Sequence, residues 1–113
     1  MTLNDYQTQA ASTAIYGANL ASPMLRLAYT TLGLNGEAGE VAEHIKKALR
    51  DDDGVITEDR RAKIVKELGD VLWYVAMTAT ELELSLDEIA QANCDKLASR
   101  SQRGTLNGAG SER

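Results

Sequence analysis

The hydrophobic positions of this chain recur with a helical period, and no alternation typical of a strand persists beyond a few residues. The pattern predicts four helices and no sheet. The first helix is expected over about residues 2–18, where Thr2 and Asp5 form a weak capping box and the apolar stripe is thin. A break from Gly17 to Ser22 follows it. The expected fold class is therefore all-α, with antiparallel helices in one protomer.

The second helix has the clearer start, because Ser22 is a good N-cap and Pro23 fits the first helical position. It is expected to end near Asp51. Glu37, Glu40 and His44 lie together beside its apolar arc. The positions of that arc recur at about 100° per residue and are predicted to face inward: Leu27, Leu34, Ala38, Val41, Ala42, Ile45 and Leu49.

Three glycines interrupt this second helix at Gly33, Gly36 and Gly39. Each costs about 1 kcal/mol relative to Ala in a helix interior. The close approach of another backbone or of a ligand would explain them. A kink or a 3₁₀ stretch near residues 30–33 is the alternative.

Thr57 is expected to cap a third helix, which is apolar over more than half its circumference and is therefore central or buried against a second subunit. Ser85 and Glu88 form a full capping box that opens a fourth helix, which is expected to end near Arg103. Its apolar positions are predicted to face inward, with Asn93 among them: Leu86, Ile89, Ala90 and Leu97.

The length of 113 residues favours one domain, expected over residues 1–103. The chain has no Phe, one Trp and four Tyr, so its core must be aliphatic and rich in Ala. Residues 104–113 contain three Gly and few large apolar side chains, which predicts a flexible or arm-like tail.

The formal net charge of −5 disfavours a nucleic-acid backbone or an anionic membrane as partner. It does not exclude an anionic substrate, provided that a metal carries the positive charge. The single Cys94 cannot form an internal disulfide, and no long apolar run or signal-peptide pattern is present. A cytoplasmic, soluble protein is the expectation.

Two acidic pairs carry the candidate chemistry, Glu37-Ala-Gly-Glu40 and Glu67-Leu-Gly-Asp70. Residues i and i+3 lie on one helix face, with Cβ atoms about 5–6 Å apart. Antiparallel packing of the second and third helices would bring the four carboxylates together. Clustered carboxylates suit Mg²⁺, which also retains waters and substrate phosphates in its shell, whereas isolated acidic pairs are ordinarily solvated helix faces. The duplication favours a site for Mg²⁺, with Mn²⁺ as a possible substitute.

The chain lacks the ligands that other kinds of metal site require. The di-iron bundles require two Glu-x-x-His pairs, whereas this chain has only His44, four residues after Glu40. One His and one Cys are too few for zinc, and no Walker loop is present. A carboxylate-bound Mg²⁺ or Mn²⁺ points instead to phosphate chemistry.

The two acidic pairs, separated by 26 residues and followed by Tyr74, resemble the MazG-type all-α nucleoside triphosphate pyrophosphohydrolases. The resemblance extends over residues 32–103, including Asn93-x-x-Lys96-x-x-x-Arg100. It implies a four-helix protomer that forms a homodimer or a dimer of dimers. It also implies cleavage of a nucleoside triphosphate to the monophosphate and pyrophosphate, in house-cleaning or control of the nucleotide pool.

In this interpretation the four carboxylates bind one or two Mg²⁺ ions, and Glu37 accepts the proton of the attacking water. The candidate substrate contacts are Tyr74 for sugar or base, Asn93 for a base edge, and Lys47, Lys96 and Arg100 for phosphates. Each has a structural alternative, namely core packing for Tyr74 and Asn93 and ordinary solvated charges for the rest.

Trp73 is interpreted as a core or subunit-interface residue, His44 as a neighbour of the acidic face, and Arg26 as a weaker phosphate candidate. Two other functions stay open. One is a non-catalytic helical module whose acidic patch binds a divalent ion. The other is a hydrolase of a different diphosphate, such as an alarmone or a phosphoribosyl-ATP-like compound.

Overall fold

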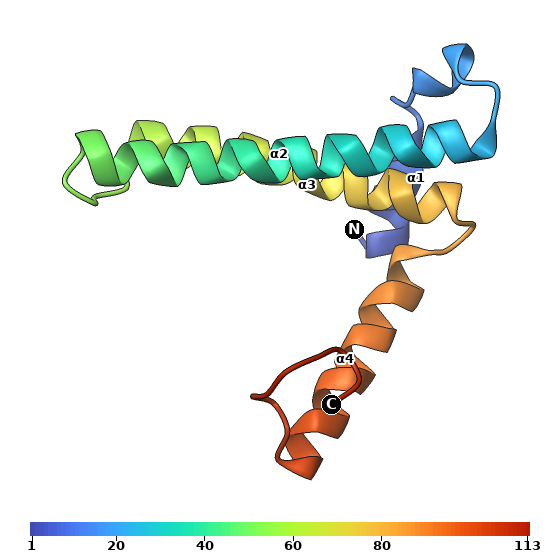
Figure 1. Cartoon of the computed structure of the whole chain (residues 1–113). Helices are drawn as coiled ribbons and strands as arrows, with labels where there is room; N and C mark the ends of the chain where they lie inside the picture. Colours follow the sequence, from blue (N-terminus) through green and yellow to red (C-terminus); the bar gives the residue numbers. More distant parts are fainter.

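The computed structural model describes residues 1–113, which form four α-helices, one short 3₁₀ helix and no strand. The all-α prediction is confirmed. Helices α2 (Pro23–Asp51) and α3 (Glu58–Glu81) pack as a long antiparallel hairpin. Helix α1 (Leu3–Ala11) packs on α3, and α4 (Leu86–Arg103) diverges from the hairpin (Figure 1).

The predicted starts of the last three helices are confirmed by their caps. The side chains of Ser22 and Thr57 each accept a hydrogen bond from the backbone N–H three residues further on. At the start of α4, Ser85 Oγ accepts from the backbone N–H of Glu88, and the Glu88 carboxylate accepts from the backbone N–H of Ser85. These bonds satisfy N–H groups that have no partner inside the helix. Helix α2 is α-helical throughout, so the alternative of a 3₁₀ stretch near residues 30–33 is wrong.

The first predicted helix, over residues 2–18, is too long. Helix α1 ends at Ala11, and a 3₁₀ turn, η1 (Tyr16–Asn19), follows it. The hydroxyls of Ser12 and Thr13 donate hydrogen bonds to the carbonyls three residues earlier, at 2.6 and 2.8 Å. Such side-chain bonds compete with helical backbone bonds, and they accompany the end of the helix here.

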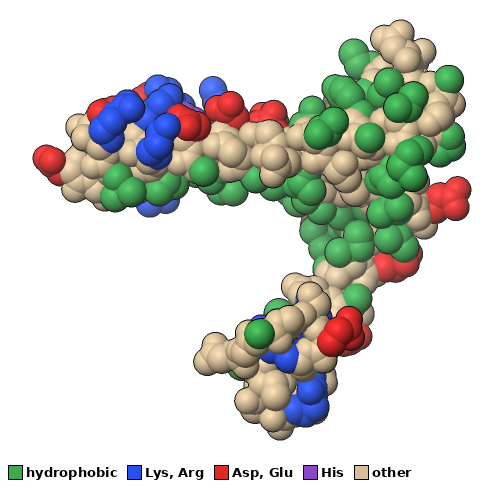
Figure 2. All heavy atoms as spheres, viewed as in Figure 1, with side chains coloured by type: hydrophobic (Ala, Val, Ile, Leu, Met, Phe, Trp, Pro, Cys, Tyr) green, Lys and Arg blue, Asp and Glu red, His purple; other side chains and the backbone are tan.

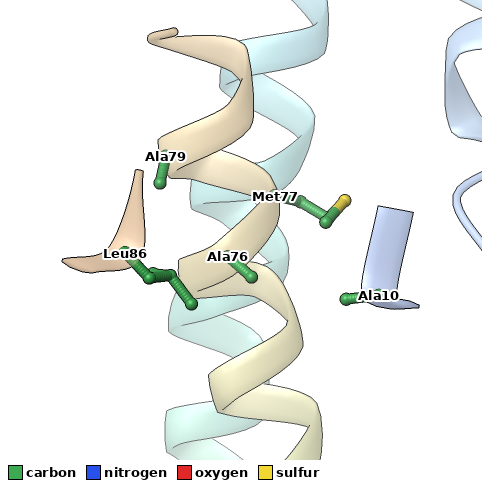
Figure 3. Packing of buried hydrophobic residues seen from close by; sticks show 5 residues of the cluster. All are labelled: Ala10, Ala76, Met77, Ala79 and Leu86. Carbon is green, nitrogen blue, oxygen red and sulfur yellow. The ribbon is translucent and has the colours of Figure 1, made fainter. Parts of the chain in front are cut away.

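The core lies where α1 crosses α3 near the start of α4. It is aliphatic and rich in Ala, as the composition predicts (Figure 3), and consists of Ala10, Ala76, Met77, Ala79 and Leu86. Gln7 of α1 ties the three helices together, because its amide oxygen accepts from the backbone N–H of Leu86 and its amide nitrogen donates to Thr80 Oγ1 of α3 and to the Leu84 carbonyl. Helix α3 is therefore central, with α1 and α2 packed against it.

The chain is extended and buries little of itself. Its radius of gyration is 17.1 Å, whereas about 13 Å is expected for a compact chain of this length. Two apolar sets predicted to face inward are only partly enclosed: Leu49 of α2 is 70% exposed, and Leu97 of α4 is 43% exposed. The reason for Leu97 is that α4 leaves the hairpin, so its apolar face has no partner within the chain. Hydrophobic side chains lie open at the junction of the helices and along the hairpin (Figure 2).

The last ten residues turn back along the end of α4 (Figure 1). Gly104 ends the helix with a positive φ of 70°, a conformation that glycine adopts without strain. Arg100 then donates to the Ser111 carbonyl at 2.5 Å, and Arg103 donates to the carbonyl of Arg113 at 2.7 Å. None of the helices combines the length and the apolar character needed to cross a membrane.

Candidate metal centre

Helices α2 and α3 direct acidic side chains toward each other. Each of Glu37, Glu67 and Asp70 offers one carboxylate oxygen, and the three oxygens lie within 4.8 Å of one another. Glu37 and Glu67 are half-buried, whereas Asp70 is exposed. Glu40 is exposed and lies outside this group. The antiparallel hairpin thus brings together three of the four carboxylates predicted from the sequence.

The electrostatics of this cluster favour a bound cation. The pKa of Glu37 is raised above its ordinary value, first by burial, then by a hydrogen bond with Glu67 and by the negative charges of Asp70, Glu67 and Glu40. A divalent cation would relieve this repulsion, and carboxylate oxygens are the ligands that Mg²⁺ and Mn²⁺ prefer. The donor set therefore fits a hard divalent cation.

His44 lies beside the cluster, one turn beyond Glu40 on α2. Its Nε2 atom is 3.6 Å from a carboxylate oxygen of Glu67, and its side chain is only 15% exposed. Its Nδ1 atom is buried without a hydrogen-bond partner. The predicted position of His44 on the acidic face is confirmed.

A cavity of about 470 Å³ opens beside the carboxylates. It is lined by Thr13, Glu37, Asp70, Trp73 and Tyr74. Two of the clustered carboxylates thus face a space large enough for part of a small molecule, and two aromatic rings form another part of its wall.

Tyr74 occupies its place because Gly33 has no side chain. A Cβ atom at Gly33 would lie 2.2 Å from Cε1 of the Tyr74 ring, so close approach explains this glycine as predicted. Gly36 and Gly39 have nothing within 4 Å of such an atom, so no neighbour within the chain explains them. Burial, the Tyr29 hydroxyl and the charges of the acidic cluster raise the pKa of Tyr74.

The sequence did not indicate Thr13 as a site residue. The indole N–H of Trp73 donates to Thr13 Oγ1 at 2.9 Å and to the Ala10 carbonyl at 3.2 Å, so the end of α1 orients this ring at the cavity. Trp73 also packs against the core, as its interpretation as a core residue requires. No sequence signal could have found Thr13, because its place depends on how α1 crosses α3.

The remaining candidate substrate residues lie elsewhere in the chain. Lys47 is half-buried on α2, two turns beyond Glu40. Asn93 and Lys96 line a different, mostly apolar cavity of about 570 Å³ at the start of α4. Arg100 is buried beneath the C-terminal tail. None of these four side chains lines the cavity beside the carboxylates.

The weaker phosphate candidate, Arg26, has a structural role. Its guanidinium pairs with Glu81 at 3.4 Å and donates to the Leu20 carbonyl at 2.9 Å. It does not line the cavity beside the carboxylates.

Comparison with known proteins identifies the family of this chain. Residues 27–105 match the MazG nucleotide pyrophosphohydrolase domain. Over 114 aligned residues, the chain is 48% identical to the Gene 37 protein of Mycobacterium phage L5, and the alignment covers 100% of both proteins. No solved structure gives a significant match. Since the matched domain spans both acidic pairs and all of α2, α3 and α4 except the first turn of α2, the chain belongs to the MazG nucleotide pyrophosphohydrolase family.

Proposed function

We propose that this protein is a Mg²⁺-dependent nucleoside triphosphate pyrophosphohydrolase, which cleaves a nucleoside triphosphate or its deoxy form to the monophosphate and pyrophosphate. The observation that carries the proposal is the convergence of Glu37, Glu67 and Asp70 within 4.8 Å in a chain of the MazG family. Mn²⁺ is the proposed substitute, because it accepts the same oxygen ligands. The proposed role is control or cleaning of the nucleotide pool.

The clustered carboxylates are the proposed metal ligands, with Glu40, one turn along α2, completing the set. When bound, the cation would neutralise the charge of the triphosphate and polarise the phosphorus under attack. Glu37 faces the cavity together with Asp70, so its carboxylate is the proposed acceptor of the proton that the attacking water loses. Tyr74, on the same wall, would contact the sugar or the base.

We also propose that the protein works as a homodimer or a dimer of dimers. The chain exposes 7870 Å², whereas a compact chain of 12.2 kDa exposes about 6100 Å². The difference of about 1800 Å² exceeds the roughly 800 Å² that each partner buries in a standard interface. Large apolar side chains on α3 and α4 supply part of this surface: Val65, Leu68, Leu72, Ile89 and Leu97.

An assembly would also give the polar side chains of α4 a role. Asn93, Lys96 and Arg100 lie outside the cavity of their own chain, on a helix that diverges from the hairpin. We propose that they contact the substrate bound by a second copy, with the tail displaced from Arg100. Lys47, on the same helix as Glu37 and Glu40, is the proposed phosphate contact within one chain.

The test is pyrophosphate release from a panel of ribo- and deoxyribonucleoside triphosphates, with Mg²⁺, Mn²⁺ or no divalent metal, followed by identification of the products. Glu67→Gln should lower the rate by orders of magnitude, because a ligand to the metal is lost. Glu58→Gln, in the first turn of α3, is the matched control and should be close to wild type.

Two results would contradict the proposal. Mg²⁺ binding without pyrophosphate release from any nucleotide would favour a non-catalytic metal-binding module. Cleavage restricted to an alarmone or a phosphoribosyl-ATP-like compound would favour a hydrolase of a different diphosphate.

A further inference from the structure

Four of the five aromatic side chains of this protein form a continuous cluster next to the cavity. The rings of Tyr16 and Tyr29 stack with centroids 5.0 Å apart, and Tyr16 meets Trp73 edge-on at 6.2 Å. Trp73 and Tyr74 line the cavity, and Tyr29 lies 6.4 Å from Tyr74. Tyr16 thus lies behind the aromatic wall, in direct contact with Trp73 and linked to Tyr74 through Tyr29.

Glu81, near the C-terminal end of α3, holds Tyr16 in this position. Its carboxylate accepts a hydrogen bond from the Tyr16 hydroxyl at 2.6 Å, a length typical of a charge-assisted bond. The second carboxylate oxygen pairs with Arg26 at 3.4 Å, and the Glu81 side chain is only 14% exposed. Burial and the hydrogen bond to the Glu81 carboxylate raise the pKa of Tyr16.

The segment that carries Tyr16 has little else to fix it. The 3₁₀ turn between α1 and α2 contains no buried residue, and Ile15, next to Tyr16, is 83% exposed. Polar contacts supply the remaining anchors, including Arg26 to the Leu20 carbonyl and Trp73 to Thr13. Only Ala14 and Tyr16 of this segment pack against the core, so specific hydrogen bonds supply much of what keeps it in place.

We infer that Glu81 is a positioning residue for nucleotide binding, which acts through Tyr16 on the aromatic wall of the cavity. It touches neither the cavity nor the clustered carboxylates. The inference rests on the proposed function for its substrate, a Mg²⁺-bound nucleoside triphosphate. Both Tyr16 and Arg26 precede the residues that match the MazG domain, so this support comes from a part of the chain outside the matched region.

The effect should fall on binding more than on chemistry. Without Glu81, the Tyr16 hydroxyl loses its acceptor and the stacked rings are no longer fixed from behind. A hydrogen bond to a charged group is worth enough to change an equilibrium by about tenfold. Glu81→Ala should therefore raise KM for the nucleotide by about tenfold, with a much smaller change in kcat.

The experiment compares Glu81→Ala and four further variants with wild type. Tyr16→Phe removes only the hydroxyl and should reproduce the rise in KM. Glu81→Gln keeps an acceptor oxygen for Tyr16 and should restore much of the affinity. Combining Tyr16→Phe with Glu81→Ala should add little to either change alone, because both remove the same bond. Asp59→Asn, which breaks an exposed ion pair with Lys63 at the start of α3, is the control.

Fluorescence of Trp73, the only tryptophan, gives a readout that does not require turnover. Quenching by acrylamide should increase in Glu81→Ala and Tyr16→Phe, and remain at the wild-type value in Asp59→Asn. Thermal unfolding followed by circular dichroism checks that each variant is folded. If Glu81→Ala does not fold, Tyr16→Phe decides the question alone, because it keeps the ring and the Glu81–Arg26 pair.

An active enzyme whose KM is unchanged in folded Tyr16→Phe and Glu81→Ala overturns the inference. If wild type releases no pyrophosphate, the proposed function fails. The role of Glu81 in positioning Tyr16 is then tested by Trp73 quenching and by Mg²⁺-dependent binding of a non-hydrolysable nucleoside triphosphate. Increased quenching together with weakened binding in Glu81→Ala and Tyr16→Phe supports the positioning role of Glu81. If quenching or binding is unchanged in these variants, the inference is overturned.

Discussion

Replacing Glu37 by Gln should stabilise the metal-free protein while abolishing its activity. The raised pKa of Glu37 means that the folded, metal-free protein binds this proton more tightly than the unfolded chain does. Stability therefore falls as pH rises from the ordinary value of 4.5 through the raised folded pKa. At neutral pH the repulsion is present in full, and the neutral Gln removes it.

The size of the effect follows from the separation of the charges. The oxygens of Glu67 and Asp70 lie within 4.8 Å of the Glu37 carboxylate. At that distance each pair repels by about 0.9 kcal/mol in the dielectric of water. Salt and the open cavity screen this repulsion further, so the net gain in unfolding free energy is about 1 kcal/mol. A gain of that size raises Tm by about 4 °C in a domain of this length.

The assay is thermal unfolding with EDTA and with Mg²⁺, measured beside pyrophosphate release. Mg²⁺ at about 100 times its Kd should stabilise wild type by about 2.7 kcal/mol through mass action. The gain should be much smaller in Glu37→Gln, and pyrophosphate release should fall by orders of magnitude. Glu40→Gln is the graded comparison, because its carboxylate lies outside the group within 4.8 Å. Its metal-free stability should match or slightly exceed that of wild type, and its response to Mg²⁺ should be weakened.

Three results would refute this reasoning. The first is a metal-free Glu37→Gln protein that is less stable than wild type at neutral pH. A difference in stability between the variant and wild type that is the same at pH 3 and at pH 7 would likewise show that repulsion does not act in this cluster. The absence of any Mg²⁺-dependent shift in wild type would refute the metal site itself.

Three further outcomes are expected. Gly33→Ala should lower the unfolding free energy measured in urea by about 1–3 kcal/mol, because the new Cβ would collide with Tyr74. Gly36→Ala has open space around the new Cβ, so it should leave the unfolding free energy unchanged or raise it by up to about 1 kcal/mol. Truncation after Arg103 should leave the helical circular dichroism and cooperative unfolding intact, because the removed residues contribute little apolar burial; a loss of cooperativity would contradict this. Leu68 is 52% exposed in the single chain, and Leu68→Glu should shift sedimentation from the oligomer to the monomer because it places a charge on the apolar face of α3. Wild type sedimenting as a monomer at micromolar concentration would contradict the oligomer.

The helices and most of their boundaries follow from local sequence signals. The side-chain oxygens of Ser22, Thr57 and Ser85 each accept a hydrogen bond from the backbone N–H three residues further along the chain. Such local hydrogen bonds depend little on the rest of the fold. The acidic spacing likewise predicted a common helix face, because residues three apart share a face in any α-helix. The first helix was predicted too long because the short-range bonds of Ser12 and Thr13 were not recognised.

Which side chains meet depends on how the helices pack against one another. Periodicity places Glu37, Glu40, Glu67 and Asp70 on two faces, but the register of α2 against α3 selects three of them for the cluster. The same holds for α4: an apolar face must be covered, yet the pattern does not say by what, and Leu97 remains open in one chain. Thr13 and Glu81 reach the cavity region through contacts with residues about 60 positions away, at Trp73 and Tyr16 respectively. Such contacts depend on how helices cross, which is set by side-chain packing between segments and leaves no periodic signal in either one.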